Sequence, residues 1–130
     1  MEAKKIYNSE GFPLRGALVI NIKKFTDIRG FFFESWNQKE FNNIVGQNIN
    51  FVQDNHSRSF LGVLRGMHYQ LNPKPQGKLV RATHGRIFDV LVDLRKDSLT
   101  FGTWAGVELN SDDCNQLWVP PGFAHGFLTI

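Results

Sequence analysis

Short strand-like runs separated by turn residues restrict the fold of this 130-residue chain more than any other feature. Val, Ile, Leu and aromatic residues gather in these runs, and Gly, Pro, Asn and Asp stand between them. About nine runs are recognisable, at 17–25, 31–36, 50–57, 62–70, 78–85, 86–95, 101–110, 115–120 and 124–130. This pattern predicts an all-β protein, a sandwich or barrel, and favours a jelly roll, whose two sheets can enclose a ligand cavity.

Only residues 37–46 have the composition of a short helix, with Gly46 at its C-terminal end. The chain contains 12 Phe and 3 Trp, enough aromatic area for a buried β core. We find no internal repeat, low-complexity segment or linker, and the length suits one domain. We therefore predict a single jelly-roll domain over residues 1–130, with one short helix.

The charge balance limits the classes of partner. A net charge of +3, spread along the chain, is too small for a dedicated nucleic-acid-binding protein but suits small anionic ligands. No run approaches the length of a membrane span, and the N-terminus has no apolar signal-peptide core. The single cysteine, Cys114, lies beside two aspartates and is expected to be an unreactive surface thiol. We predict a cytoplasmic protein without membrane contact.

The segment VLRGMHYQLNPKPQGKLVRATHG (63–85) places polar and cationic residues where strands usually carry apolar ones. Arg65, His68 and Lys78 either form a site or lie on a solvated face. Simple alternation puts Arg65 and His68 on opposite faces of their strand. Gly66 allows a bulge that would bring both to one side. Alternation alone leaves the two arrangements open.

Asp89 lies in the middle of a strongly apolar strand, where a carboxylate needs a partner. It either belongs to a structural ion pair or orients a histidine or lysine in a cavity. His56 and His84 adjoin turns and are expected to be solvated. The cluster FTDIRGFFFES (25–35) is predicted to be a hairpin with a charged tip.

A metal site is considered because a β-barrel with four histidines invites one. His125, in PPGFAHGF, fits the second metal motif of cupin barrels. The first motif would need His-x-His and a nearby Glu, and Gln70 stands at the second histidine position. A catalytic metal needs about three protein ligands, so we predict a barrel without metal.

Six ordered blocks resemble one family. The blocks are DIRGFFFE, QDNHS, GVLRGMHYQ, PQGKLVRATHGRIFDVLVDLR, SLTFGTWAGVEL and LWVPPGFAHGF. Together, from about residue 12 to residue 130, they resemble the dTDP-4-dehydrorhamnose 3,5-epimerases, metal-independent cupin-like isomerases of deoxysugar biosynthesis. The resemblance implies base-catalysed epimerisation at C3 and C5 of dTDP-4-dehydro-6-deoxy-D-glucose through an enolate, without a cofactor.

The resemblance also implies residue roles. His68 would be the general base, Lys78 would stabilise the enolate oxygen, and Asp89 would be a supporting carboxylate that could pair with Lys78. Arg65 would hold the diphosphate or the sugar. Further substrate-binding positions match Gln53, Asn55, His125, Arg29 and Glu34. The last two reach the nucleotide in this family, often across a homodimer interface, and Phe25 belongs with them less securely.

The chain departs from the family pattern at its end. In the family a tyrosine beyond AHGF returns the proton, and a later aspartate orients the base. Because residue 130 precedes both positions, we expect a chain that lacks the C-terminal part of the family, as a fragment or as a naturally shorter protein. The alternatives are a 3-epimerase, a non-catalytic barrel that binds nucleotide sugars, and a metal-dependent cupin.

Overall fold

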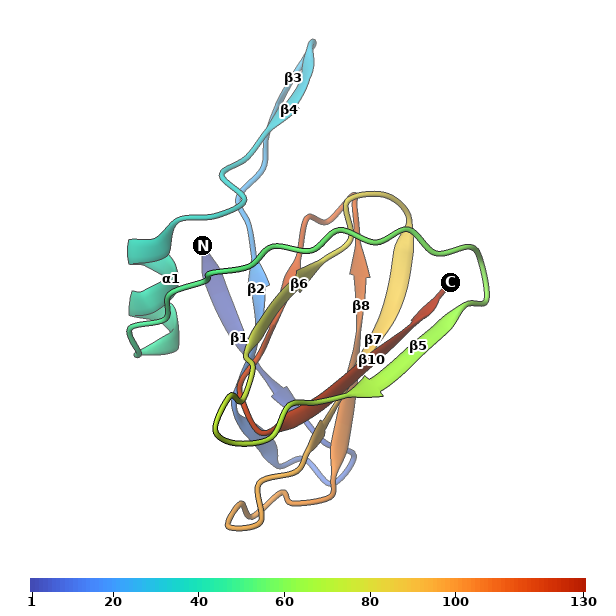
Figure 1. The fold of residues 1–130 in the computed structure, drawn as a ribbon. Helices are drawn as coiled ribbons and strands as arrows, with labels where there is room; N and C mark the ends of the chain where they lie inside the picture. Colours follow the sequence, from blue (N-terminus) through green and yellow to red (C-terminus); the bar gives the residue numbers. More distant parts are fainter.

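The computed structural model describes all 130 residues and confirms an all-β, cupin-like jelly roll with one helix (Figure 1). One antiparallel sheet has the order β1-β2-β9-β6, a second has the order β5-β10-β7-β8, and β3 and β4 form a hairpin. The elements are β1 Glu2–Tyr7, β2 Pro13–Asn21, β3 Phe25–Asp27, β4 Gly30–Phe32, α1 Gln38–Val45, β5 Leu64–His68, β6 Lys78–Arg81, β7 Arg86–Asp93, β8 Trp104–Asn110, β9 Gln116–Val119 and β10 Phe123–Thr129.

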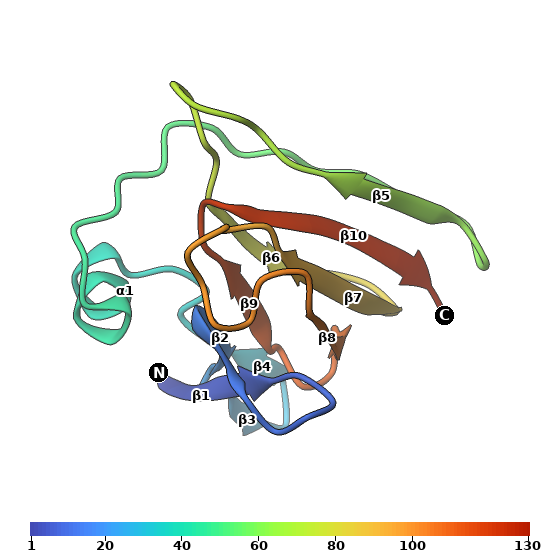
Figure 2. The same ribbon diagram turned by 90° about the horizontal axis from the view of Figure 1, so that it is seen from below.

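The two sheets face each other, and their inward residues form the main core. Seen from below, β5 and β10 run side by side along one edge of the barrel, opposite the β1–β2 hairpin (Figure 2). Burial alternates along β7: Asp89, Leu91 and Asp93 are buried, while Phe88 remains exposed. The core residues come from both sheets, among them Leu14, Leu91, Leu109, Leu117 and Phe123.

The predicted helix is confirmed as α1, and it closes one end of the first sheet. Asn37 caps its N-terminus by accepting a hydrogen bond from the Glu40 amide, and Gly46 ends it in the left-handed conformation (φ 72°). Phe41 packs edge-on against Trp118 of β9, with ring centroids 5.3 Å apart. This contact anchors the helix to the sheet and builds a second apolar cluster.

Several sequence predictions are wrong in detail. Residues 50–57 form no strand: this stretch crosses the barrel opening as an extended loop (Figure 1), because no neighbouring strand pairs with it. The run 31–36 is a strand only to Phe32, and β1 was not predicted. Cys114 is a buried thiol rather than a surface one, and it donates a hydrogen bond to the Ser111 carbonyl.

Candidate functional site

The site begins with an irregularity in the pairing of β5 with β10. His68 lies opposite His125, and Arg65 lies opposite Phe127. Three residue steps along β5 therefore match two along β10, so β5 contains one extra residue. Residues directly opposite in a sheet share a face. Because His125 and Phe127 share a face, the bulge brings Arg65 and His68 to the same side, as Gly66 allowed.

Gly66 makes this bulge possible. Its φ of +120° is rarely adopted by residues with a side chain, and an added Cβ would lie 2.6 Å from the Cα of Gly126. Gly126 in turn faces the backbone of β5: a Cβ added at Gly126 would lie 2.7 Å from the carbonyl oxygen of Arg65. The two glycines thus let β5 and β10 approach closely at the place where β5 carries Arg65 and His68.

Asp89 is paired with His125. Its Oδ1 lies 2.6 Å from Nε2 of the histidine, and the aspartate is completely buried. Burial raises the pKa of Asp89, and the hydrogen bond and charge of His125 oppose that rise. The partner that a buried Asp89 requires is therefore His125.

Lys78 reaches the same group of residues from the other sheet. Its Nζ donates a long hydrogen bond of 3.4 Å to the His68 carbonyl. Burial lowers the pKa of Lys78, and the negative charge of Asp89 counteracts this. Lys78 forms no ion pair within 4.0 Å of Asp89, so the direct partner of that carboxylate is His125 and not the lysine. A half-buried ammonium without a carboxylate partner is available to a developing negative charge.

A cavity of about 1230 Å³ opens beside Lys78. Gln53 and Asn55 line it from the loop that crosses the opening, and their amides are hydrogen-bonded at 3.1 Å. The guanidinium of Arg65 donates to the Ser59 hydroxyl at 2.9 Å and to the Arg58 carbonyl at 3.3 Å. Ser59 and Arg58 also line the cavity, so Arg65 is held against its wall. Nothing in the sequence pattern had singled out these two residues.

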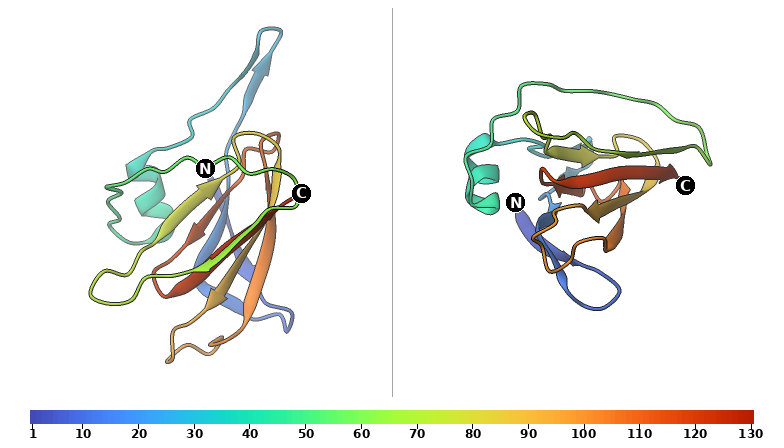
Figure 3. Two further views of the ribbon diagram at one scale, coloured as in Figure 1. Left: turned by 45° about the vertical axis from the view of Figure 1, so that its right-hand side comes forward. Right: turned by 60° about the horizontal axis from the view of Figure 1, so that its bottom comes forward.

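The structure leaves Arg29 and Glu34 apart from this group. The β3–β4 hairpin extends away from the barrel (Figure 3). At its tip Arg29 pairs with Asp27, and 85% of the Arg29 side chain is exposed. That interaction lowers the pKa of Asp27 and confirms a hairpin with a charged tip. Glu34 is exposed, and so is Phe25, at 56%.

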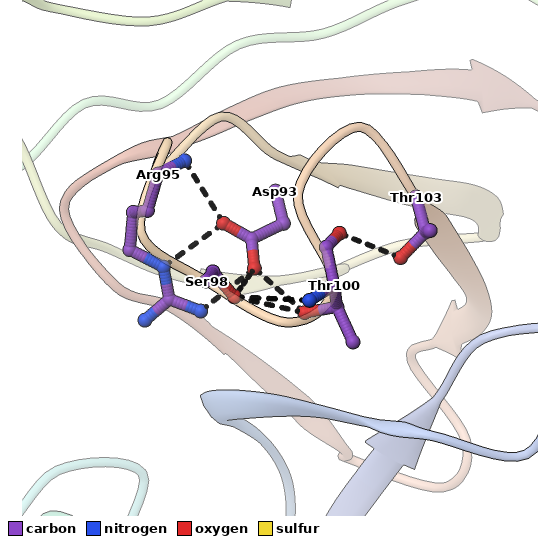
Figure 4. A network of polar contacts seen from close by, with 5 residues as sticks. All are labelled: Asp93, Arg95, Ser98, Thr100 and Thr103. Carbon is purple, nitrogen blue, oxygen red and sulfur yellow. Dashed lines mark hydrogen bonds and ion pairs between the residues drawn. The ribbon is translucent and has the colours of Figure 1, made fainter.

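A second buried carboxylate, Asp93, belongs to the structure of the β7–β8 loop. It accepts hydrogen bonds from Arg95, Ser98 and Thr100 (Figure 4). Burial alone would raise the pKa of Asp93, but these hydrogen bonds hold it far below its ordinary value. Asp93 was not singled out from the sequence, although alternation already put it on the same face as Asp89.

The remaining predictions concern histidines, metals and membranes. His56 and His84 are both exposed, as expected. No group of three or more His, Cys, Asp or Glu side chains comes together in an arrangement that could hold a metal ion. No helix is long and apolar enough to cross a membrane.

Comparison with known proteins agrees with this geometry. The family model of the dTDP-4-dehydrorhamnose 3,5-epimerases matches residues 11–130. A dTDP-4-dehydrorhamnose 3,5-epimerase of Shigella flexneri is 58% identical over 113 residues, which cover 87% of this chain and 62% of the relative. The chain thus spans about three fifths of the length of this relative and of two similar enterobacterial ones.

Two solved structures have the same fold. The dTDP-6-deoxy-D-glucose-3,5-epimerase of Legionella pneumophila, in complex with dTDP-4-keto-L-rhamnose, matches with a TM-score of 0.88 and 44% identity, covering 99% of this chain and 66% of the other. A 3'-monoepimerase of Streptomyces bikiniensis, in complex with dTDP-quinovose, matches with a TM-score of 0.83 and 30% identity, covering 88% and 58%.

Proposed function

Because the chain belongs to the dTDP-4-dehydrorhamnose 3,5-epimerase family, we propose that its site epimerises a dTDP-4-dehydro-6-deoxyhexose. The substrate would be dTDP-4-dehydro-6-deoxy-D-glucose and the product dTDP-4-dehydro-L-rhamnose. The observation that carries this proposal is the meeting of His68, Lys78 and the Asp89–His125 pair from four strands of two sheets.

The chemistry requires a base and a cation beside the same sugar. The C4 ketone acidifies the protons at C3 and C5, since removal of either gives an enolate with its charge on the C4 oxygen. His68 is exposed and can take the proton. The ammonium of Lys78 lies beside the His68 backbone and can stabilise the oxygen, usually the larger contribution. Return of a proton to the opposite face of the enolate completes each inversion, and solvent water or the tyrosine that the family pattern has beyond residue 130 would supply that proton. None of these steps needs a cofactor.

Binding of the nucleotide diphosphate is assigned to the cations and amides around the cavity. Arg65 can offer a planar fork to phosphate, which a lysine cannot. Gln53 and Asn55 lie on the cavity wall and can meet the sugar or the base. A solved relative is described with dTDP-4-keto-L-rhamnose bound, which supports this ligand class.

We further propose a homodimer in which Arg29 and Glu34 serve the partner's site. The β3–β4 hairpin stands away from its own cavity and exposes Phe25, Phe31 and Phe32. An exposed apolar arm of this kind fits a protein interface. One chain has a mass of 14.9 kDa, and light scattering should give twice that mass. Deletion of residues 25–32 should abolish association.

The test of function is hydrogen exchange. The protein is incubated in D₂O with the 4-keto sugar nucleotide, and deuterium at C3 and C5 is followed by NMR. Exchange at both positions, abolished by His68→Asn, is the expected result. Exchange at one position only would support the 3-epimerase alternative. A solved 3'-monoepimerase with the same fold is the relative that motivates this alternative. Binding of dTDP without any exchange would support a binding module instead.

A further inference from the structure

The strand β6 leaves one of its two edges free. It is the last strand of its sheet, and its only partner is β9, which pairs with all four residues Lys78–Arg81. No other backbone–backbone hydrogen bond of the protein reaches β6. The N–H and C=O groups along its free edge are therefore available to one more strand, because a sheet edge is a template for pairing.

Residues 51–59 lie across the cavity from this edge and have no backbone partner of their own. They belong to the extended segment that crosses the barrel opening, and no backbone–backbone hydrogen bond involves them (Figure 1). The cavity of about 1230 Å³ is lined by this segment and by β6. A site for a small molecule usually occupies about 300–1,000 Å³. The cavity thus has room for more than a sugar nucleotide, between two backbones that both lack a partner.

Contacts at the two ends of the cavity show that residues 51–61 and β6 run in the same direction. At the first end, Phe51 packs edge-on against Trp118, with ring centroids 6.0 Å apart, and Trp118 pairs with Leu79 of β6. The beginning of the crossing segment is thus fixed beside the beginning of β6.

At the second end, both walls meet the end of β10. The Gly62 amide, just after the crossing segment, donates a hydrogen bond of 2.9 Å to the Thr129 carbonyl. The Ile130 amide donates one of 3.2 Å to the carbonyl of Arg86, which begins β7, the strand after β6. Thr129 and Ile130 also line the cavity. A strand that enters beside Ile130 would run back along both walls, antiparallel to each of them.

The side chains of β6 define the two faces that such a strand would have. Val80 packs against the main core between the sheets, and Leu79 packs against the cluster that contains Phe41 and Trp118. Residues directly opposite in neighbouring strands share a face. A strand beside β6 would therefore need apolar side chains at every second position, opposite Leu79. Its alternate positions would face the interior, on the side of Val80 and Lys78.

We propose that the space between β6 and residues 51–61 binds one extended strand, and that its occupant is the segment that follows the AHGF block in longer members of the family. The family model matches this chain through residue 130, which lies at the cavity. The 113 matched residues are only 62% of the Shigella flexneri relative, so that protein has further chain to supply such a strand. A bound strand would narrow the cavity and give backbone partners to both walls. Strand binding does not depend on the reaction proposed above.

A synthetic peptide tests the proposal with the unmodified protein. Its sequence is that of the Shigella flexneri relative directly after the block that matches AHGF, roughly 10 residues, the length of a long strand. Fluorescence anisotropy of the labelled peptide should rise on binding, and hydrogen–deuterium exchange should slow at residues 51–59 and 78–81. A scrambled peptide of the same composition is the first control. The second control carries N-methyl groups on alternate amides, which removes donors and keeps every side chain, and it should bind roughly tenfold more weakly or worse.

Proline substitutions test the wall formed by the crossing segment. His56→Pro and Ser57→Pro, made separately, each remove one N–H, and neighbouring N–H groups of an extended chain point to opposite edges. One of the two should weaken peptide binding roughly 2- to 10-fold. The free protein should keep its fold, because neither backbone amide is paired. Lys96→Pro is the matched control, since it occupies the second position of the Arg95–Ser98 turn, where proline is favoured.

The proposal is overturned if anisotropy does not rise at peptide concentrations up to about 1 mM. Equal binding of the native, scrambled and N-methylated peptides, or unchanged binding in both His56→Pro and Ser57→Pro, would also refute pairing along the two walls. Protection of residues 78–81 that grows with protein concentration in the absence of peptide would assign the edge to a second copy of this chain. A protein that binds the peptide as expected but exchanges no proton at C3 or C5 would count against the epimerase function and leave the strand site standing.

Discussion

Replacing Gly66 by alanine tests whether the bulge in β5 builds the site. The new Cβ would lie 2.6 Å from the Cα of Gly126 and 2.9 Å from the His125 carbonyl oxygen, both backbone atoms that cannot rotate away. The positive φ of +120° adds about 1–3 kcal/mol of backbone strain. Overpacking of this kind typically costs another 1–3 kcal/mol. We expect Gly66→Ala to lower the free energy of unfolding by about 2–6 kcal/mol.

Gly85→Ala is the matched control, because Gly85 has a φ of +71° and no atom within 4 Å of its added Cβ. That substitution should cost only the conformational term, about 1–2 kcal/mol. Urea unfolding followed by tryptophan fluorescence gives both values. In folded Gly66→Ala, displacement of β5 from β10 should also slow exchange at C3 and C5. Equal losses of stability in the two variants would refute the close-approach argument.

Three further substitutions test other parts of the structure. Asp93→Ala should cost about 3–5 kcal/mol at pH 7, because it leaves the buried donors around it unpaired. Hydrogen bonding lowers the pKa of Asp93 in the folded protein below the unfolded value of 3.8, so Asp93 contributes its full stabilisation above pH 3.8. Urea unfolding should therefore show the stability difference between Asp93→Ala and the wild type shrinking as the pH falls below 3.8. Asn37→Ala removes the helix cap and should lower stability by about 1 kcal/mol in the same assay. Lys78→Met should slow exchange at C3 and C5 by about 10²–10³-fold with little change in dTDP affinity by calorimetry. As the pH is raised, Lys78 should lose its proton and the wild-type exchange rate should start to fall before pH 10.5 is reached, because burial lowers the pKa of Lys78 below that ordinary value.

The strands of the core could be predicted because their burial is regular. In β7 burial follows the period of two, so Asp89, Leu91 and Asp93 share one face as alternation requires, but alternation alone did not say that this face is the buried one. The same reasoning missed β1, where Lys4 and Lys5 are exposed on an edge strand and hide the apolar pattern. It also predicted a strand at 50–57, where Phe51 and Val52 have strand propensity. A strand needs a neighbour to pair with, and that neighbour is not visible in the local sequence.

The geometry of the site depends on contacts between distant residues. The convergence of Arg65 and His68 requires one extra residue in β5, which alternation cannot count, and a close approach to Gly126 some 60 positions away. The family resemblance implied roles for Arg65 and His68, but it did not show how the fold brings them to the same side. The partner of Asp89 is likewise 36 positions distant, so the local sequence could not identify it, and the pairing of β7 with β10 was needed.

Asp89 and Asp93 show why two buried carboxylates on one strand face have different functions. Asp93 ends β7, and the following loop brings it Arg95, Ser98 and Thr100 within seven residues, so its charge is satisfied locally and its pKa is lowered. Asp89 lies in mid-strand, where its neighbours point the other way or are apolar. Its partners must come from other strands, one of its oxygens remains without a hydrogen bond, and its pKa is raised. A carboxylate that the local sequence cannot satisfy is stable only where several strands bring polar groups together. The same convergence of donors and charges, in a place shielded from water, is what proton transfer to and from a sugar requires.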